Sequence, residues 1–447
     1  MHGASGHETT VLFGLHPLWV ATLLFVATYA VIMTDKLNRA IVALLGAGLL
    51  ILVGVLDQKE AMGAVDWNTL GLLLGMMLIV NITRRSGLFQ YVAIWSAKKV
   101  DASPWGIMLM MSIVTAVFSA FLDNVTTVLL TVPVTLLITE ELKVKPYPYL
   151  FAQIFASNIG GTATLIGDPP NIMIGSATGL TFNDFAIALT PVIVVIMVAT
   201  LVPLYFIWGR HLSATDENRR HVMGFNEREA ITDPRLLKQS LLVIALVILG
   251  FMLQRQTGIE PATIAIFGAA VLLLLDNLGK DSETQSKNVH AALSEAEWIT
   301  LMFFLGLFVL VHGIQKAGLI DLMAQGLLKA TGGDFSVTAL AILWASAVLS
   351  AFIDNIPFVA TMIPLIKAMA PTFGGDAALL PLWWALSLGA CLGGNGTLIG
   401  ASANLVVAGL AERAGTGFRF IEYLKVAFPL MLISIVLSHL YLYWRFL

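Results

Sequence analysis

Long uncharged apolar stretches, separated by short polar connections, recur along the whole chain. A helix needs about 20 mostly apolar residues to cross a hydrocarbon core of about 30 Å, and many of these stretches approach that length. They predict an all-α polytopic membrane protein with about ten transmembrane helices, near residues 17–34, 40–56, 67–83, 149–175, 185–208, 239–254, 260–276, 297–313, 382–409 and 422–446.

Four further regions differ from plain spans. Two apolar regions, 105–139 and 338–369, are each divided by an Asp-Asn pair. The stretches 86–100 and 316–330 are amphipathic, which is consistent either with the scaffold of a dimer or with helices lying in the membrane interface of a monomer.

Loop charges predict the orientation of the chain in the membrane. The longest polar connection, from Gly209 to Lys238, is rich in arginine, and the positive-inside rule places it in the cytoplasm. The acidic loop around Asp57, Glu60 and Asp66 then falls outside, and both termini are predicted to be external.

Composition supports a membrane protein and excludes several other classes. Only 12% of the 447 residues are charged and 58% are hydrophobic, whereas soluble domains carry about 25% charged residues. The lipid bilayer is therefore the expected surrounding, and a net charge of −3 spread over loops argues against a nucleic-acid partner. The N-terminal stretch lacks the features of a cleaved signal, so the first apolar segment is expected to remain as a span, with His2 and His7 as tail residues.

Known catalytic motifs are missing from the sequence. It contains no nucleophile elbow, HExxH pair or P-loop, so neither an enzyme nor a nucleotide-driven motor is predicted. Active transport would have to use an ion gradient or a separate ATPase subunit. The single cysteine, Cys391, can form neither an internal disulfide nor a multi-cysteine metal site.

Two polar motifs are repeated in the second half of the chain. SAFLDNVTTVLLTVP, which begins at Ser119, returns as SAFIDNIPFVATMIP, which begins at Ser350. GGTATLIGDPPN, from Gly160, returns as GGNGTLIGASAN from Gly393, at nearly the same separation along the chain. Chance similarity between apolar segments would not preserve these polar positions, so the chain contains an internal repeat.

The repeat has a consequence for topology. Five predicted crossings separate Trp67 from its counterpart Trp298, and this odd number turns the second half upside down. The halves, 1–222 and 223–447, are therefore predicted to be inverted-topology repeats. This arrangement is typical of alternating-access carriers that bind their substrate near the midplane.

Both glycine-rich motifs predict broken helices, because glycine and proline interrupt helical structure. Unwound backbone at membrane depth is tolerated where it lines a site, and the half-helix after it presents its positive end to a bound group. Close packing of helices through glycine is the alternative. The candidate binding residues in these motifs are Asn158, Gly160, Gly161, Thr162, Thr164, Asn171, Gly393, Gly394, Asn395, Thr397 and Asn404.

Acidic residues within apolar regions are the strongest candidates for function. Asp123 and Asp354 lie in otherwise uncharged segments, where a charge costs at least about 2.5 kcal/mol. With Asn124 and Asn355 beside them, they are suited to bind a cation, take up a coupling proton or cap the helix that follows.

Other candidates are less symmetric between the halves. Thr126 and Thr127 follow the first Asp-Asn pair and have no hydroxylated counterparts in the second. Asp168 is a third candidate carboxylate, replaced by Ala401 in the second repeat, although Asp before Pro-Pro is also ordinary turn chemistry. Cys391 is a possible soft contact for a metalloid, but a lone buried thiol usually serves packing.

At these residues the chain resembles the ion transporter superfamily, and most closely its branch of bacterial arsenite permeases and the melanosomal P protein. The resemblance covers nearly the whole chain and rests on FLDNVTTVLL, NIGGTATLIGDPPN, FIDNIPFVATMIP and GACLGGNGTLIGASAN. It implies a bacterial inner-membrane protein in which 105–139 and 338–369 are re-entrant hairpins, with the Asp-Asn pairs at their tips. Substrate would lie between these tips and the two broken helices.

The resemblance also implies a function: efflux of arsenite or antimonite, coupled to proton entry and without a cofactor. Carboxylate carriers of the superfamily have Ser-Asn-Thr at both tips, whereas this chain has Asp-Asn-Val and Asp-Asn-Ile. Two acidic tips would repel a dicarboxylate, and no Lys or Arg lies between Val100 and Glu140 or between Lys367 and Glu412 to compensate. Sodium/proton antiport is the alternative expectation, ahead of an anion carrier or a passive channel.

Overall fold

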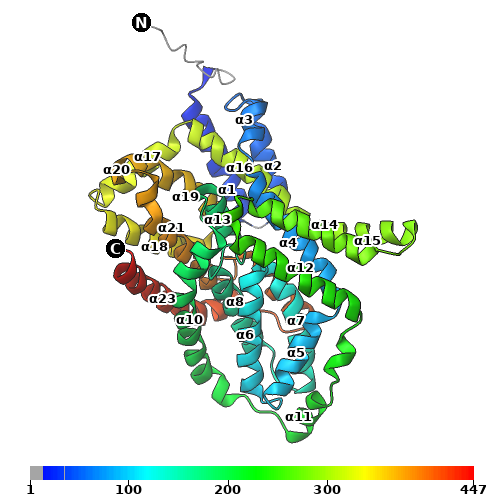
Figure 1. The fold of residues 1–447 in the computed structure, drawn as a ribbon. Helices are drawn as coiled ribbons and strands as arrows, with labels where there is room; N and C mark the ends of the chain where they lie inside the picture. Colours follow the sequence, from blue (N-terminus) through cyan, green and yellow to red (C-terminus); the bar gives the residue numbers. More distant parts are fainter. Residues whose placement is uncertain (1–13, 35) are drawn as a thin grey trace.

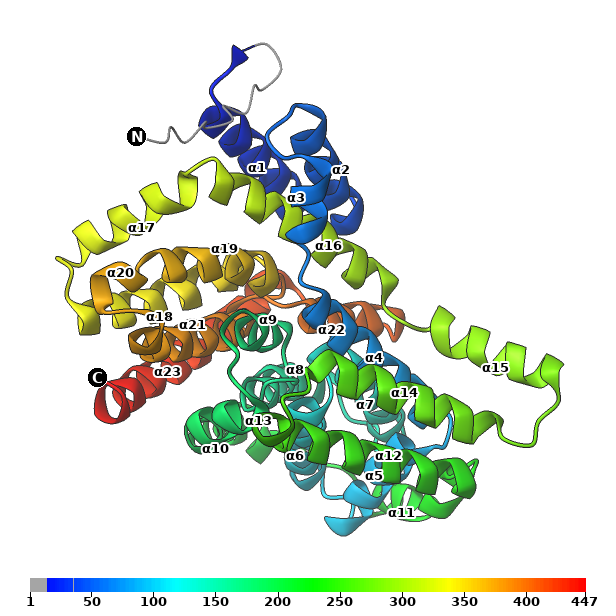
Figure 2. The same ribbon diagram turned by 45° about the horizontal axis from the view of Figure 1, so that its top comes forward.

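The computed structural model describes residues 14–34 and 36–447, and every regular element in these ranges is helical. His2 and His7 lie outside the described residues. Figures 1 and 2 show a bundle of helices with α11 (Asp216–Met223) at the end far from the N-terminal helices. The all-helical fold predicted from the sequence is confirmed.

Six helices outside the hairpins and broken helices pack on one another. Within this group α2 packs on α16 and α14 packs on α4, and glycine allows both close contacts, because Gly306 faces the backbone of Ala43 and Gly75 faces that of Ala265. The group comprises α1 (Pro17–Met33), α2 (Arg39–Leu52), α4 (Trp67–Arg84), α12 (Pro234–Met252), α14 (Pro261–Asn277) and α16 (Trp298–Lys316).

Each half contributes a hairpin, a broken helix and one long helix. In the first half these are α6 (Pro104–Phe121) with α7 (Asn124–Glu141), α8 (Tyr147–Thr162) with α9 (Pro169–Thr178), and α10 (Phe182–Ile207). The counterparts are α18 (Phe335–Phe352) with α19 (Asn355–Ala368), α21 (Leu380–Gly393) with α22 (Ser402–Arg413), and α23 (Phe420–Arg445).

Proline sets several of the helix starts. It stands at the first or second position of α6, α8, α9 and α21, where its missing N–H removes no helical hydrogen bond and its fixed φ suits a helix. Because α8 ends at Thr162 and α9 begins at Pro169, the Pro-Pro pair starts a new helix after the break. The two helix breaks predicted from the sequence are therefore present.

The remaining helices connect these elements. The amphipathic stretches form α5 (Leu88–Lys99) and α17 (Leu319–Ala330), each preceded by a glycine with positive φ, Gly87 and Gly318. The other short elements are α3 (Gln58–Gly63), η2 (Gly209–His211), η3 (Glu227–Ala230), α13 (Gln254–Thr257), α15 (Ser282–Ser294), α20 (Ala370–Phe373), η4 (Asp376–Leu379) and η5 (Gly394–Gly396).

The number of long spans differs from the ten predicted. Seven helices of the described chain are long and apolar enough to cross a membrane, and the count reaches eight if α4 and α5, bent by 66°, form one span. Two of the seven are α6 and α18, which the sequence analysis treated as hairpin arms. The helix breaks divide predicted spans, and α1, α2 and α14 have only 17, 14 and 17 residues.

Candidate functional site

The two hairpin tips carry the acidic residues singled out in the sequence. Asp123 is the N-cap of α7 and accepts hydrogen bonds from the backbone N–H of Thr126, at 2.8 Å, and from its hydroxyl, at 2.5 Å. Asp354 is the N-cap of α19 and accepts one from the N–H of Ile356, at 3.0 Å. Both carboxylates therefore cap helices, and both are largely buried.

Hydroxyl groups fix each hairpin to the broken helix beside it. Ser119 donates to the carbonyl of Ser157 at 2.6 Å, and Ser350 donates to that of Ala390 at 2.7 Å. The breaks contribute a second bond, from Thr164 to the carbonyl of Ala120 and from Thr397 to that of Ala351. Thr164 and Thr397, two of the predicted binding residues, thus donate their hydroxyl hydrogen bonds to the hairpin backbone.

The glycines of both motifs also hold the hairpins close. A Cβ on Gly160 would overlap the carbonyl oxygen of Ala116 in α6, and one on Gly393 would overlap that of Ala347 in α18. The helix α8 continues through Gly160 and Gly161, so the unwound segment begins only at Ala163. The packing alternative therefore describes these glycines better than a helix break does.

This packing predicts that Gly160→Ala destabilises the protein. The new methyl would meet backbone that cannot move aside, and overpacking of this kind costs about 1–3 kcal/mol. Gly409, in α22, is the matched control, since nothing lies within 4 Å of a Cβ there and Ala is the better helix former by about 1 kcal/mol. Thermal unfolding in detergent should show a lower melting temperature for G160A alone. Equal melting temperatures for the two variants would contradict the packing argument.

A network of buried amides connects the two halves. Asn124, at the first tip, donates to Asn158 Oδ1 at 3.2 Å. The Asn158 amide nitrogen donates to Asn395 Oδ1 and to Asn404 Oδ1, both at 2.9 Å and both in the other half. Asn404 in turn donates to two carbonyls of the second break, those of Gly394 and Thr397. One amide thus joins the first tip to the second broken helix.

Asn171 is the counterpart of Asn404 in the first half. It donates to the carbonyls of Thr162 and Thr164, at 3.1 and 2.9 Å, and so holds the first break. Its oxygen accepts from Ser387 at 2.6 Å and lies 3.6 Å from the sulfur of Cys391. Cys391 is fully buried and occupies the repeat position of Asn158, so packing and a weak hydrogen bond account for it.

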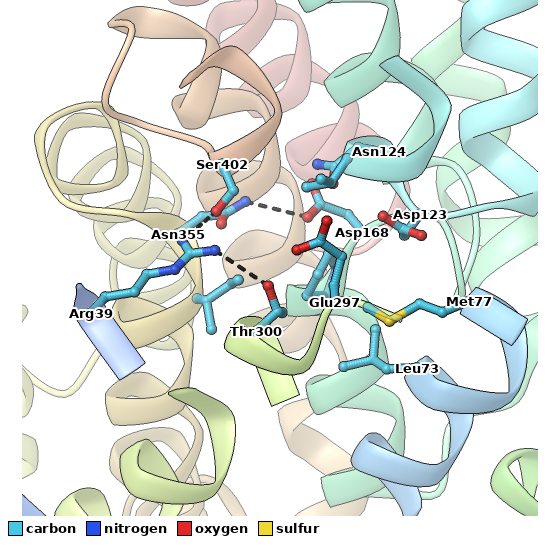
Figure 3. Close-up of a pocket in the computed structure, with 13 residues that line it drawn as sticks. Arg39, Leu73, Met77, Asp123, Asn124, Asp168, Glu297, Thr300, Asn355 and Ser402 are labelled. Carbon is cyan, nitrogen blue, oxygen red and sulfur yellow. Dashed lines mark hydrogen bonds between the residues drawn. The ribbon is translucent and has the colours of Figure 1, made fainter. Parts of the chain in front are cut away.

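A small cavity lies where the two tips approach each other (Figure 3). Its volume is about 20 Å³, which is room for one water molecule or a small ion. Three carboxylates, those of Asp123, Asp168 and Glu297, line it together with Asn124 and Asn355. The cavity is therefore rich in oxygen ligands and in negative charge.

Asp168 is the most deeply buried of these acids. Its side chain is inaccessible to solvent, and Asn355 donates to Oδ1 at 3.3 Å from the opposite tip. The second carboxylate oxygen, Oδ2, has no hydrogen-bond partner in the described structure. A buried carboxylate oxygen is costly without a donor or a cation, so this atom marks a place for one.

Only some of the residues predicted to bind substrate or ions line the cavity. Asp123, Asn124, Asp168 and Asn355 line the cavity, while the others support the tips and breaks or pack nearby. Thr162 donates to the carbonyl of Asn158, and the hydroxyl of Thr127 is buried without a partner in the described chain.

Arg39 is the main residue that the sequence analysis missed. It reaches the rim of the cavity, where its guanidinium lies 2.9 Å from Asp354 Oδ2 and also donates to the hydroxyls of Ser402, at 2.5 Å, and Thr300, at 3.4 Å. The expectation that no cation compensates the second tip is therefore wrong, because the compensating residue comes from a segment 315 positions away. Glu297 was also missed, although it precedes Trp298 as Asp66 precedes Trp67 in the repeat.

Comparisons with known proteins agree on a class of membrane transporter. A sequence profile of the CitMHS family, described as citrate transporter, matches residues 29–389. An uncharacterized transporter of Mycobacterium tuberculosis is 42% identical over 431 residues, covering 96% of this chain and 98% of that protein. The human P protein is 33% identical over 506 residues, covering 95% of this chain but only 59% of its own length.

Two solved structures share the fold. The YdaH transporter of Alcanivorax borkumensis aligns with a TM-score of 0.55 at 16% identity, over 96% of this chain and 98% of its own. MtrF of Neisseria gonorrhoeae, from a class described as antimetabolite efflux pumps, aligns with a TM-score of 0.55 at 14% identity, over 97% and 96%. At these identities the likeness concerns the fold alone.

Proposed function

Since this chain belongs to the CitMHS family of the ion transporter superfamily, we propose that it is an antiporter that couples proton entry to the export of a small solute. It is an integral membrane protein and a secondary transporter, not an enzyme. One observation supports proton coupling most directly: three carboxylates surround a cavity of about 20 Å³, and none of them has an ion-pair partner in the described chain. Such a group of acids requires protons or a bound cation to be stable at membrane depth.

Alternating access follows if the halves, 1–222 and 223–447, are inverted repeats. Their matching hairpins, breaks and anchoring hydroxyls support this, because related contacts occur in both: Ser119 and Ser350, and Thr164 and Thr397. In addition, α22 packs on α7 and α19 packs on α9, so each hairpin contacts the broken helix of the other half. Inverted halves of equal construction give two related states that open to opposite sides.

Arsenous acid is the first candidate substrate. It is a small neutral hydroxylated molecule, and the amides of Asn124 and Asn355 offer donors and acceptors next to the cavity. Citrate, named by the family description, is disfavoured here, because three carboxylates face the cavity and the one nearby arginine is already paired with Asp354.

Sodium/proton exchange is the second candidate, and a specific observation favours it. The cavity is of the size of a single ion, and carboxylate and amide oxygens surround it. A sodium ion would satisfy Asp168 Oδ2, which lacks a partner in the described structure.

Reconstitution of the purified protein in liposomes tests these proposals. With an imposed pH gradient and a pH-sensitive dye inside, addition of arsenite is expected to dissipate the gradient, because each substrate movement carries protons. Dissipation by sodium alone would replace arsenite export with sodium/proton exchange, and dissipation by citrate would overturn both candidates. Arsenite flux that never accumulates the solute against its own gradient would identify a passive channel instead.

A further inference from the structure

The two hairpin tips differ in how their carboxylates are neutralised. Asp354 is paired with Arg39 at 2.9 Å, and the Ser402 hydroxyl donates to the same oxygen at 3.0 Å. Asp123 accepts hydrogen bonds from Thr126 alone, and among the described residues no cation lies within ion-pair distance of it. The repeats thus place one charged pair and one unpaired acid at related positions.

The two tips differ in hydrogen bonding because proline replaces a hydroxylated residue at one position near each of them. Ser402, which bonds Asp354, corresponds to Pro169 in the first half, and Thr126, which bonds Asp123, corresponds to Pro357 in the second. Neither tip can therefore reproduce the hydrogen bonds of the other.

Helix packing shows what stands in the place of Arg39. Gly306 packs on Ala43 and Gly75 packs on Ala265, so α2 corresponds to α14, with Ala43 matching Ala265. In this alignment the first residue of α2, Arg39, matches the first residue of α14, Pro261. The second half therefore supplies no cationic side chain to the Asp123 tip from the position that matches Arg39.

Arg39 is held firmly in its place. Its guanidinium lies over the ring of Phe303, at 5.2 Å from the centroid, while Ser402 and Thr300 accept its hydrogen bonds. The Arg39 side chain is 24% exposed and that of Asp354 is 12% exposed, so the pair is partly shielded from water. An arginine stays charged in proteins, and it therefore provides a permanent positive charge at the second tip.

We infer that Arg39 acts as a built-in cation at the Asp354 tip, so that the transporter has one exchangeable cation site, between Asp123 and Asp168, rather than one at each tip. The inference rests on the proposed cation coupling and adds a stoichiometric consequence to it. Arg39 from α2 is the charged group in contact with Asp354, while Asp168 is reached through Asn355 and Glu297, at the start of α16, lines the same cavity as Arg39. Without Arg39 these neighbours are all acidic, and Asp354 would need a proton or a cation of its own.

Arg39→Gln tests the inference, with Arg39→Lys as the charge-preserving control. In liposomes with a fixed arsenite gradient and no membrane potential, the pH gradient that stops net flux reports the number of protons per arsenite. This number is expected to rise by one in R39Q, to stay unchanged in R39K, and to return to the wild-type number in R39Q/D354N. An unchanged ratio in R39Q would overturn the inference, whereas absence of pH-driven flux in the wild type would instead refute the proposed function.

A second measurement does not depend on the substrate. Infrared spectra of the detergent-purified proteins are expected to show an additional protonated-carboxyl band in R39Q that is lost in R39Q/D354N. If sodium rather than a proton fills the vacated place, added NaCl should suppress this band. If R39Q melts at a lower temperature but gains neither the band nor the extra cation, Arg39 is a structural partner of Asp354 and the inference is wrong.

Discussion

Asp123→Asn is expected to reduce gradient-driven transport to the level of liposomes without protein. Asn caps helices about as well as Asp, so the start of α7 should remain intact in this variant. What disappears is the carboxylate that faces Asp168 and Glu297 across the cavity, and with it a group able to take up and release the coupling proton. Exchange of substrate for substrate across the membrane should persist, because it requires no net proton movement.

Asp334→Asn is the matched control for this variant. Asp334 caps α18 by accepting from the N–H of Val337 at 2.8 Å, but it is exposed and lies at the opposite end of α18 from the hairpin tip. Transport by D334N should equal that of the wild type. If D123N also transports normally, with an unchanged dependence on pH, then Asp123 serves as a helix cap and takes no part in coupling.

Elements that depend on local chemistry were predictable from the sequence. The breaks follow from a glycine-rich motif that occurs twice, and the acidic tips from a repeated Asp-Asn motif, since polar residues persist in apolar segments only where structure or function requires them. That these tips belong to hairpins was implied by the family resemblance. Asp123 and Asp354 could be placed at helix starts because an Asp-Asn pair before an apolar run is an N-cap signal. The structure has helices beginning directly after both.

Long-range pairing was not predictable. The arginine that neutralises Asp354 stands 315 positions earlier, just after a short connection, where the positive-inside rule treats it as a loop charge. No local pattern distinguishes Arg39 from Lys36, which lies in the same connection. Only the fold brings Arg39 to the second tip.

Roles within the glycine-rich motifs were also beyond the sequence. A glycine can interrupt a helix or permit two helices to pack closely, and the sequence alone does not distinguish these two roles. The structure separates them, since Gly160 faces Ala116 within a continuous helix while the unwound backbone follows at residues 163–168. In the same way, Thr164 resembles a ligand in the sequence but bonds a backbone carbonyl in the fold.

Asn158→Leu is expected to destabilise the protein and to abolish transport together. The Asn158 amide is the donor to Asn395 and Asn404 of the other half, and the acceptor for Asn124 at the first tip. Leucine has a similar volume but cannot make these bonds, so buried amide groups on three neighbours would lose a partner. Each unsatisfied buried group costs about 1–3 kcal/mol, which should appear as a lower melting temperature in detergent.

The transport loss should exceed what instability alone explains, because Asn158 joins the first tip to the second broken helix and both must keep their relative position around the cavity. Asn183→Leu is the control: this residue donates one amide hydrogen bond, to the carbonyl of Met252 at 2.8 Å, near the surface and away from the cavity. N183L should melt and transport nearly as the wild type does. N158L is to be assayed well below its melting temperature. If it then transports at the wild-type rate, the amide network only stabilises the fold. Coupling between the halves must in that case depend on other contacts, such as that of Asn355 with Asp168.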